Sequence, residues 1–259
     1  MGNIQSKIDD QIYIITYNCQ IKYFSNYKSN RLLNYILNYK DNNFILCIQG
    51  LYDDNTISYI ENNITKNINI IKSNYKNGLI ILCTYDIIHP EQILFKSDKE
   101  NKNIINNNKG FILFNVTFNN NLISIYNTEL QNDIYNNLIL YDIRLKQISE
   151  ILLHIANRQK DNNHLNLHLI VGALYIDNIK SNKLYDVMNS FNSNIVTNID
   201  TNSREDYILF FTETNYKSND IINYMHKKYN IDLLNIIIRE EMNFSKNLPC
   251  EIILKINKN

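Results

Sequence analysis

The hydrophobic positions of this chain gather into short apolar runs that polar clusters separate. Eight runs read as β-strands: residues 12–16, 44–48, 79–83, 111–118, 122–126, 167–171, 207–211 and 252–256. Within each run nearly every position is apolar, where a half-exposed strand would alternate apolar and polar positions. We therefore expect most of these strands to be buried on both faces.

Helical periodicity appears between the strands. It is clearest over residues 140–155, where Ile143, Ile148 and Ile151 share one side while Arg144 and Glu150 fall on the other. Residues 31–39, 55–63 and 221–228 are further predicted helices, and the polar segment 97–108 is a predicted surface loop. Strands and helices alternate with no repeat and no linker, so we expect a flexible leader over residues 1–11 and one α/β domain over residues 12–259.

Charge and composition narrow the function classes. Lys plus Arg and Asp plus Glu number 26 each, so the net charge is zero. The charge balance therefore argues against a nucleic-acid partner, because proteins that bind nucleic acid usually carry a basic excess or stripe. The 19 tyrosines, Tyr23 and Tyr27 among them, are interpreted as core and surface filling and not as a base-stacking surface. Abundant Asn, Ile, Lys and Tyr indicate an AT-rich genome, as in some large DNA viruses and protists.

Cysteine and histidine usage favours no zinc site. Cys19, Cys47, Cys83 and Cys250 lie far apart without a CxxC pair, so we interpret them as buried free thiols in a reducing compartment. His164 and His168 flank a predicted strand at about 13 Å separation, too far to share a metal, and we interpret them as surface residues. No signal peptide and no membrane-spanning apolar stretch is present, so the sequence favours a cytoplasmic protein that is not secreted.

The first six residues, MGNIQS, fit the N-myristoylation pattern with Gly2 as the acceptor. The competing interpretation is an ordinary solvated leader, and the sequence leaves both open. A single acyl chain gives only marginal membrane binding, and Lys7 alone makes no polybasic patch. The expected partners are therefore an unidentified protein and, through Gly2, a weakly held membrane.

Seven strand-end segments occur in an order and at spacings typical of one enzyme superfamily. They are residues 16–20 (TYNCQ), 45–50 (ILCIQG), 78–83 (GLIILC), 126–131 (YNTELQ), 169–175 (LIVGALY), 204–208 (REDYI) and 248–254 (LPCEIIL). The chain resembles the endonuclease/exonuclease/phosphatase superfamily over residues 12–256. The segment NTELQ at 127–131, followed by the predicted helix, is most similar to the neutral sphingomyelinase or phospholipase C branch. The resemblance implies two mixed β-sheets packed face to face, with helices on the outside.

The resemblance also implies what should stand at the catalytic positions. The family's metal-binding Glu corresponds to Gly50, and the His of its Asn-Thr-His motif to Glu129. Its water-activating Asp and neighbouring Asn correspond to Ala173 and Tyr175. In the closing Ser-Asp-His motif, Cys250 and Glu251 replace the Asp and the His. Asn18 and Asp206 are retained, although with Glu251 in the His position Asp206 has nothing to orient.

With its metal ligand, base and general acid replaced, the chain is predicted to be a catalytically inactive homologue that needs no cofactor and works as a binding or structural module. Two acquired carboxylates, Glu129 and Glu251, would also repel a phosphodiester. The alternative is a diverged metal-dependent phosphodiesterase acting on a phospholipid or a nucleic acid. In that case Glu129, Glu251, Asn18 and Asp206 would hold Mg²⁺ or Ca²⁺, since both prefer oxygen ligands.

Overall fold

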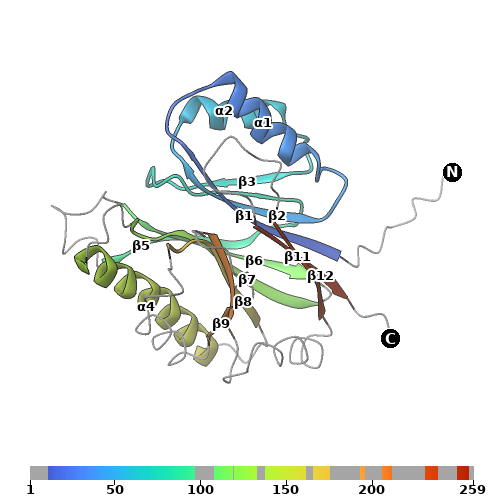
Figure 1. The fold of residues 1–259 in the computed structure, drawn as a ribbon. Helices are drawn as coiled ribbons and strands as arrows, with labels where there is room; N and C mark the ends of the chain where they lie inside the picture. The colour runs from blue at the N-terminus through green and yellow to red at the C-terminus, as the bar shows by residue number, and fades with distance from the viewer. Residues whose placement is uncertain are drawn as a thin grey trace.

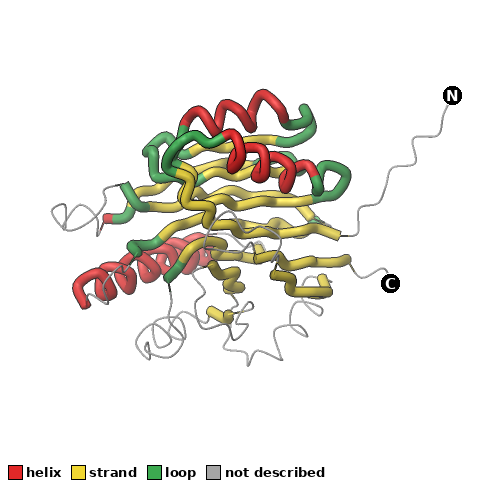
Figure 2. The backbone as a smooth tube through the Cα atoms, turned by 45° about the horizontal axis from the view of Figure 1, so that its top comes forward, coloured by secondary structure: helices red, strands yellow, loops and turns green. Residues whose placement is uncertain are grey.

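The computed structural model describes residues 11–96, 108–118, 120–132, 138–161, 166–175, 193–195, 206–211, 231–238 and 250–256. They build two six-stranded mixed β-sheets packed face to face, with helices on both outer faces (Figures 1 and 2). The predicted α/β sandwich of four layers is confirmed. Gly2, helix 221–228 and nearly all of the predicted loop 97–108 lie outside the described residues.

The first sheet has the strand order β11-β12-β1-β2-β4-β3. Its strands are β1 (Gln11–Ile21), β2 (Phe44–Leu51), β3 (Asn69–Lys72), β4 (Ile80–Cys83), β11 (Ile231–Ile238) and β12 (Cys250–Ile256). The central pair β1 and β2 is parallel, and its other neighbours are antiparallel. Buried residues fill both faces of β2, as its continuous apolar sequence predicts.

The second sheet has the order β5-β6-β7-β8-β10-β9. Its strands are β5 (Ile88–Leu94), β6 (Gly110–Phe118), β7 (Asn121–Glu129), β8 (Asn166–Ala173), β9 (Ser193–Ile195) and β10 (Asp206–Phe211). It repeats the plan of the first sheet, because its central pair β7 and β8 is parallel and is flanked by antiparallel strands.

In the part of the chain that the structure describes, three helices supply the outer layers. Helices α1 (Asn26–Leu37) and α2 (Asp54–Asn63) pack on the first sheet, and α4 (Leu138–Asp161) packs on the second (Figure 2). Helix α2 begins where Asp53 accepts a hydrogen bond from the backbone N–H of Thr56 at 2.6 Å, a standard N-cap. None of the described helices is long and apolar enough to cross a membrane.

The main hydrophobic core lies between the sheets, where side chains from both inner faces meet. It includes Cys47 and Cys83, and Cys19 is buried in the layer under α1 and α2. All three are free thiols, as predicted. Burial raises the pKa of the Cys83 thiol to about 12, so it stays uncharged.

Two polar residues that the sequence analysis placed on the surface are buried in the layer between α4 and the second sheet. His168 on β8, predicted to lie on the surface, is only 1% exposed and packs against Tyr126. Arg144, assigned to the exposed side of its helix, is buried. His164 lies outside the described residues.

The buried His168 makes stability depend on pH. Burial, with smaller contributions from Arg158 and His154, lowers the pKa of His168 to about 4. The unfolded chain binds a proton at this residue below about pH 6.5, whereas the folded protein does so only near pH 4. The contribution of neutral His168 to the free energy of unfolding is therefore fully present above pH 6.5 and falls by about 3 kcal/mol as the pH drops to 4.

Urea denaturation across this pH window should show the loss of stability, and the variant His168→Phe should remove most of that pH dependence. An unchanged pH dependence in that variant would contradict the assignment.

Candidate functional site

The carboxyl ends of the two parallel strand pairs meet at one edge of the sandwich. In the first sheet Asn18 of β1 stands next to Gln49, one residue before Gly50 on β2. In the second, Glu129 of β7 is the register partner of Ala173 on β8. The fold therefore places the predicted site residues from four strands at one edge.

A buried amide network joins the sheets beneath this edge. Gln49 donates to Asn127 Oδ1 across the sheets at 2.8 Å and receives a hydrogen bond from the Thr16 hydroxyl at 3.2 Å. Asn127 in turn donates to the backbone carbonyls of Ile48 and Ile80. Because buried amides in such a network accept few other geometries, they fix the spacing between the sheets.

Glu129 is the centre of the site and is held by a lysine. The Lys109 ammonium lies 2.8 Å from Glu129 Oε1, and both side chains are less than a tenth exposed. The Tyr52 hydroxyl donates to the other oxygen, Oε2, at 2.8 Å, and Lys109 also reaches that hydroxyl at 3.4 Å. Both carboxylate oxygens are therefore engaged and the charge is balanced inside the protein.

Tyr175 fills the space between Glu129 and Asn18. Its hydroxyl donates to Glu129 Oε1 at 3.1 Å and accepts from the Asn18 amide at 3.0 Å. Its backbone has φ +51°, an unusual conformation for a bulky residue. The buried Arg144 guanidinium holds that conformation by donating to the Tyr175 carbonyl at 2.6 Å.

Gly50 leaves no room for a side chain. Its φ of +69° favours glycine, and a Cβ atom there would lie 2.8 Å from Asn18 Oδ1 and 2.9 Å from the Gln20 backbone nitrogen. Neighbouring atoms therefore occupy the space that the side chain of the metal-binding Glu implied by the resemblance would need.

The hydroxyl of Tyr52 is a hydrogen-bond donor and not a base. Burial, together with the negative charge of Glu129, raises the pKa of Tyr52 well above its ordinary value. The proton therefore stays on the oxygen at any physiological pH. Gly78 makes this placement possible, because a Cβ on that residue would lie 2.9 Å from the Tyr52 ring.

The remaining predicted residues contribute backbone positions. Asp206 pairs with Ala173 at the start of β10, and Cys250 and Glu251 pair with Thr16 and Ile15 of β1. These registers bring β10 and β12 to the same edge, while the side chains of Asp206, Cys250 and Glu251 lie outside the described part of the structure.

The described donor set does not fit the divalent metal that the resemblance implies. Among the described side chains, no three His, Cys, Asp or Glu residues are grouped to hold a cation. Glu129, the catalytic-position carboxylate whose side chain the structure describes, is already paired with an ammonium. A divalent ion would have to displace Lys109 or share the Glu129 oxygens with it. Sharing is unfavourable, because the ion and the ammonium would repel each other at contact distance.

Sequence reasoning missed Lys109 and Tyr52. Lys109 adjoins the polar stretch that was interpreted as a surface loop. Pairing the predicted strands 111–118 and 122–126 as a hairpin that turns at Asn119 and Asn120 would have indicated Lys109. In that register Gly110 lies opposite Glu129, so Lys109 lies close to Glu129. That register agrees with the observed pairing of Phe111 with Thr128.

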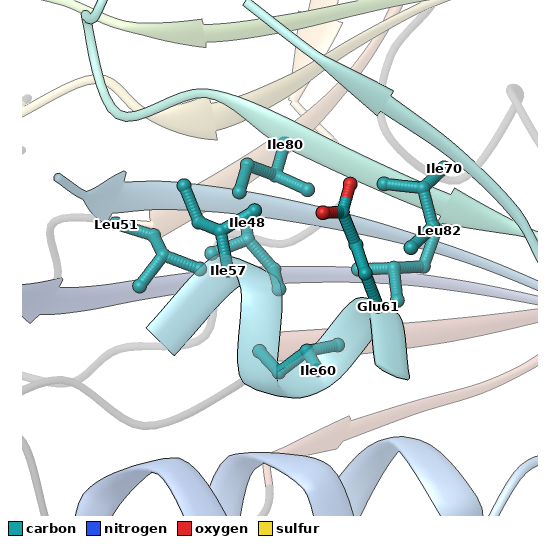
Figure 3. A pocket seen from close by; sticks show the side chains of 8 residues that line it. All are labelled: Ile48, Leu51, Ile57, Ile60, Glu61, Ile70, Ile80 and Leu82. Carbon is teal, nitrogen blue, oxygen red and sulfur yellow. The ribbon is translucent and has the colours of Figure 1, made fainter. Parts of the chain in front are cut away.

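A hollow away from this edge lies between α2 and the outer face of the first sheet (Figure 3). Its volume is about 210 Å³, including the part open to solvent. The lining is aliphatic apart from Glu61: Ile48, Leu51, Ile57, Ile60, Ile70, Ile80 and Leu82. Glu61 is paired with Lys72 at 2.8 Å, so this hollow offers packing space and no reactive group.

No protein-family model matches the sequence, and no curated protein matches it. Solved structures match over nearly the whole chain. Sphingomyelinase C from Streptomyces griseocarneus is 12% identical, with a TM-score of 0.64, over 95% of this chain and 99% of that one. D. rerio TDP2, in complex with a single-strand DNA product, is 11% identical, with a TM-score of 0.67, over 95% of this chain and 100% of that one.

An endonuclease/exonuclease/phosphatase protein from Beutenbergia cavernae is 8% identical, with a TM-score of 0.65, over 96% of this chain and 72% of that one. At these identities the likeness shows the fold. The fold is that of the endonuclease/exonuclease/phosphatase superfamily, and a sphingomyelinase is among its structural neighbours. The resemblance seen in the sequence is confirmed at the level of the fold.

Proposed function

We propose that this protein is a catalytically inactive member of the phosphoesterase fold, retained as an intracellular binding or structural module. One observation carries the proposal: the buried Glu129 carboxylate is neutralised by the Lys109 ammonium at 2.8 Å. An internal cation stands at the edge of the fold where the resemblance implies a metal-dependent centre.

The other site residues support the same proposal. Tyr175 occupies the space beside Asn18, and Tyr52 keeps its proton and so does not act as a general base. Gly50 and Ala173 offer no ligand. Hydrolysis of a phosphodiester needs a polarising group and an activated water. The cation described at this edge, Lys109, is already engaged with Glu129, which supports the proposal.

Strained backbone conformations are nevertheless concentrated at this edge, and this favours a retained function over the decay of an unused site. Several of its residues have left-handed backbone conformations: Gln20, Gly50, Gly78, Asn108 and Tyr175. Such conformations cost about 1–3 kcal/mol each in non-glycine residues and cluster at functional sites. A binding role is consistent with a strained but filled site.

An activity assay tests the proposal. Purified protein is incubated with bis(p-nitrophenyl) phosphate, sphingomyelin or a single-stranded oligonucleotide, each with Mg²⁺, Mn²⁺, Ca²⁺ or Zn²⁺. We expect no turnover above a buffer blank. Metal-dependent hydrolysis that Glu129→Gln abolishes would establish instead the diverged phosphodiesterase that the sequence left open.

A further inference from the structure

Exposed aromatic side chains gather at the same edge as the candidate site. Tyr23 is 82% exposed and Phe24 42%, both in the connection from β1 into α1, and Tyr27, in the first turn of α1, is 63% exposed. Tyr75, in the turn between β3 and β4, is 37% exposed. These four residues are called the aromatic rim below.

Backbone hydrogen bonds bring the two loops of the rim together. The N–H of Tyr52, directly after β2, donates to the carbonyl of Ile21 at the end of β1. The neighbouring N–H of Leu51 donates to Gly78 in the turn that carries Tyr75. In Figure 1 this turn projects on the left, beside the connection that rises into α1. The rim therefore borders Tyr52, whose hydroxyl reaches Glu129.

The two segments that carry the rim are the connection with the first turns of α1 and the turn between β3 and β4; side-chain contacts hold the first, and both are basic. Phe24 packs edge-on against Tyr59 of α2, and the Arg31 guanidinium lies over the Tyr27 ring and donates to its hydroxyl. Residues 22–31 and 73–79 carry Lys22, Lys28, Arg31 and Lys76 and not one Asp or Glu.

Two acidic residues follow Tyr52 directly: Asp53 is engaged as the cap of α2, and Asp54 is the first residue of that helix. Together these loops and the start of α2 keep a net positive charge, although the whole chain is neutral.

We infer that the aromatic rim is an interfacial membrane-binding surface for lipid bilayers that carry anionic headgroups. Tyrosine and phenylalanine rings favour the boundary between acyl chains and water, and lysines beside them attract acidic lipid. The inference deepens the proposed function by naming what a non-catalytic module would bind. It does not need an acyl group on Gly2.

Vesicle co-sedimentation tests the inference without any hydrolysis, so its outcome is separate from the activity assay. Purified full chain that carries no acyl group is mixed with phosphatidylcholine vesicles, with or without phosphatidylserine. The variants are Y23S/F24S, K22Q/K76Q and, as a matched control, L153S, which removes a similarly exposed apolar side chain from α4.

We expect binding that requires phosphatidylserine and weakens with salt. Each lysine near an anionic surface strengthens binding about fivefold, so K22Q/K76Q should bind about 25-fold more weakly. Y23S/F24S should lose at least about tenfold, because two rings leave the interface, while L153S should bind as wild type. Absence of vesicle binding, or equal losses in all three variants, would overturn the inference. So would binding of an oligothymidylate in place of vesicles, which would assign the rim to nucleic acid.

Discussion

Lys109→Met is expected to destabilise the protein by about 3–5 kcal/mol, because it leaves the buried Glu129 carboxylate without its counter-charge. Lys109 and Glu129 are 2.8 Å apart and less than a tenth exposed, so water does not replace the ammonium. The free energy of unfolding from urea denaturation measures the effect.

A matched control is available on the surface. Lys72 forms an ion pair of the same length with Glu61, but the two side chains are 49% and 31% exposed. Lys72→Met should therefore cost less than about 1 kcal/mol. The double variant K109M/E129Q should recover much of the loss, since no buried charge remains. Equal losses in Lys109→Met and Lys72→Met would show that the buried pair does not stabilise the site.

Gly50→Glu, which restores the residue that the resemblance implies, is expected to fail as a reversion. The φ of +69° costs a non-glycine residue about 1–2 kcal/mol, and the new Cβ would press against Asn18 and the Gln20 backbone. A further carboxylate would also enter an edge that already holds Glu129. We expect a loss of about 3–4 kcal/mol and no metal-dependent activity.

The variant Gly50→Ala separates the effect of backbone and steric strain from the effect of the added charge. It shares the backbone strain and the Cβ contacts but adds no charge, so about 2 kcal/mol of the loss should remain. Urea denaturation of both variants measures the difference. Wild-type stability of Gly50→Glu, with newly gained metal binding, would mean that the edge is open and that the account of a closed site is wrong.

The sequence predicted the central strands well, because their apolar runs require burial on both faces whatever surrounds them. Strands at or near the sheet edges were missed. β5, with the sequence IHPEQIL, mixes polar residues and a proline into a half-exposed strand and so has no clear period. β3 has only four residues, two of them exposed.

The sequence predicted which residues lie at the site, but it did not predict which side chains contact one another there. Asn18, Gly50, Glu129 and Tyr175 came from strand-end motifs, and the structure brings them to one edge. The partner of Glu129 could not be read in the same way, because Lys109 reaches it through the pairing of β6 with β7. His168 and Arg144 show the same limit, since their burial depends on how α4 packs on the second sheet.

Calorimetric titration of the purified protein with Mg²⁺ and Ca²⁺ tests the central claim most directly. If Lys109 neutralises Glu129 in place of a metal, neither ion should give binding heat up to millimolar concentration, and Glu129→Gln should behave as wild type. Micromolar binding of either ion that Glu129→Gln abolishes would contradict the account, because the edge would then be a rebuilt metal site.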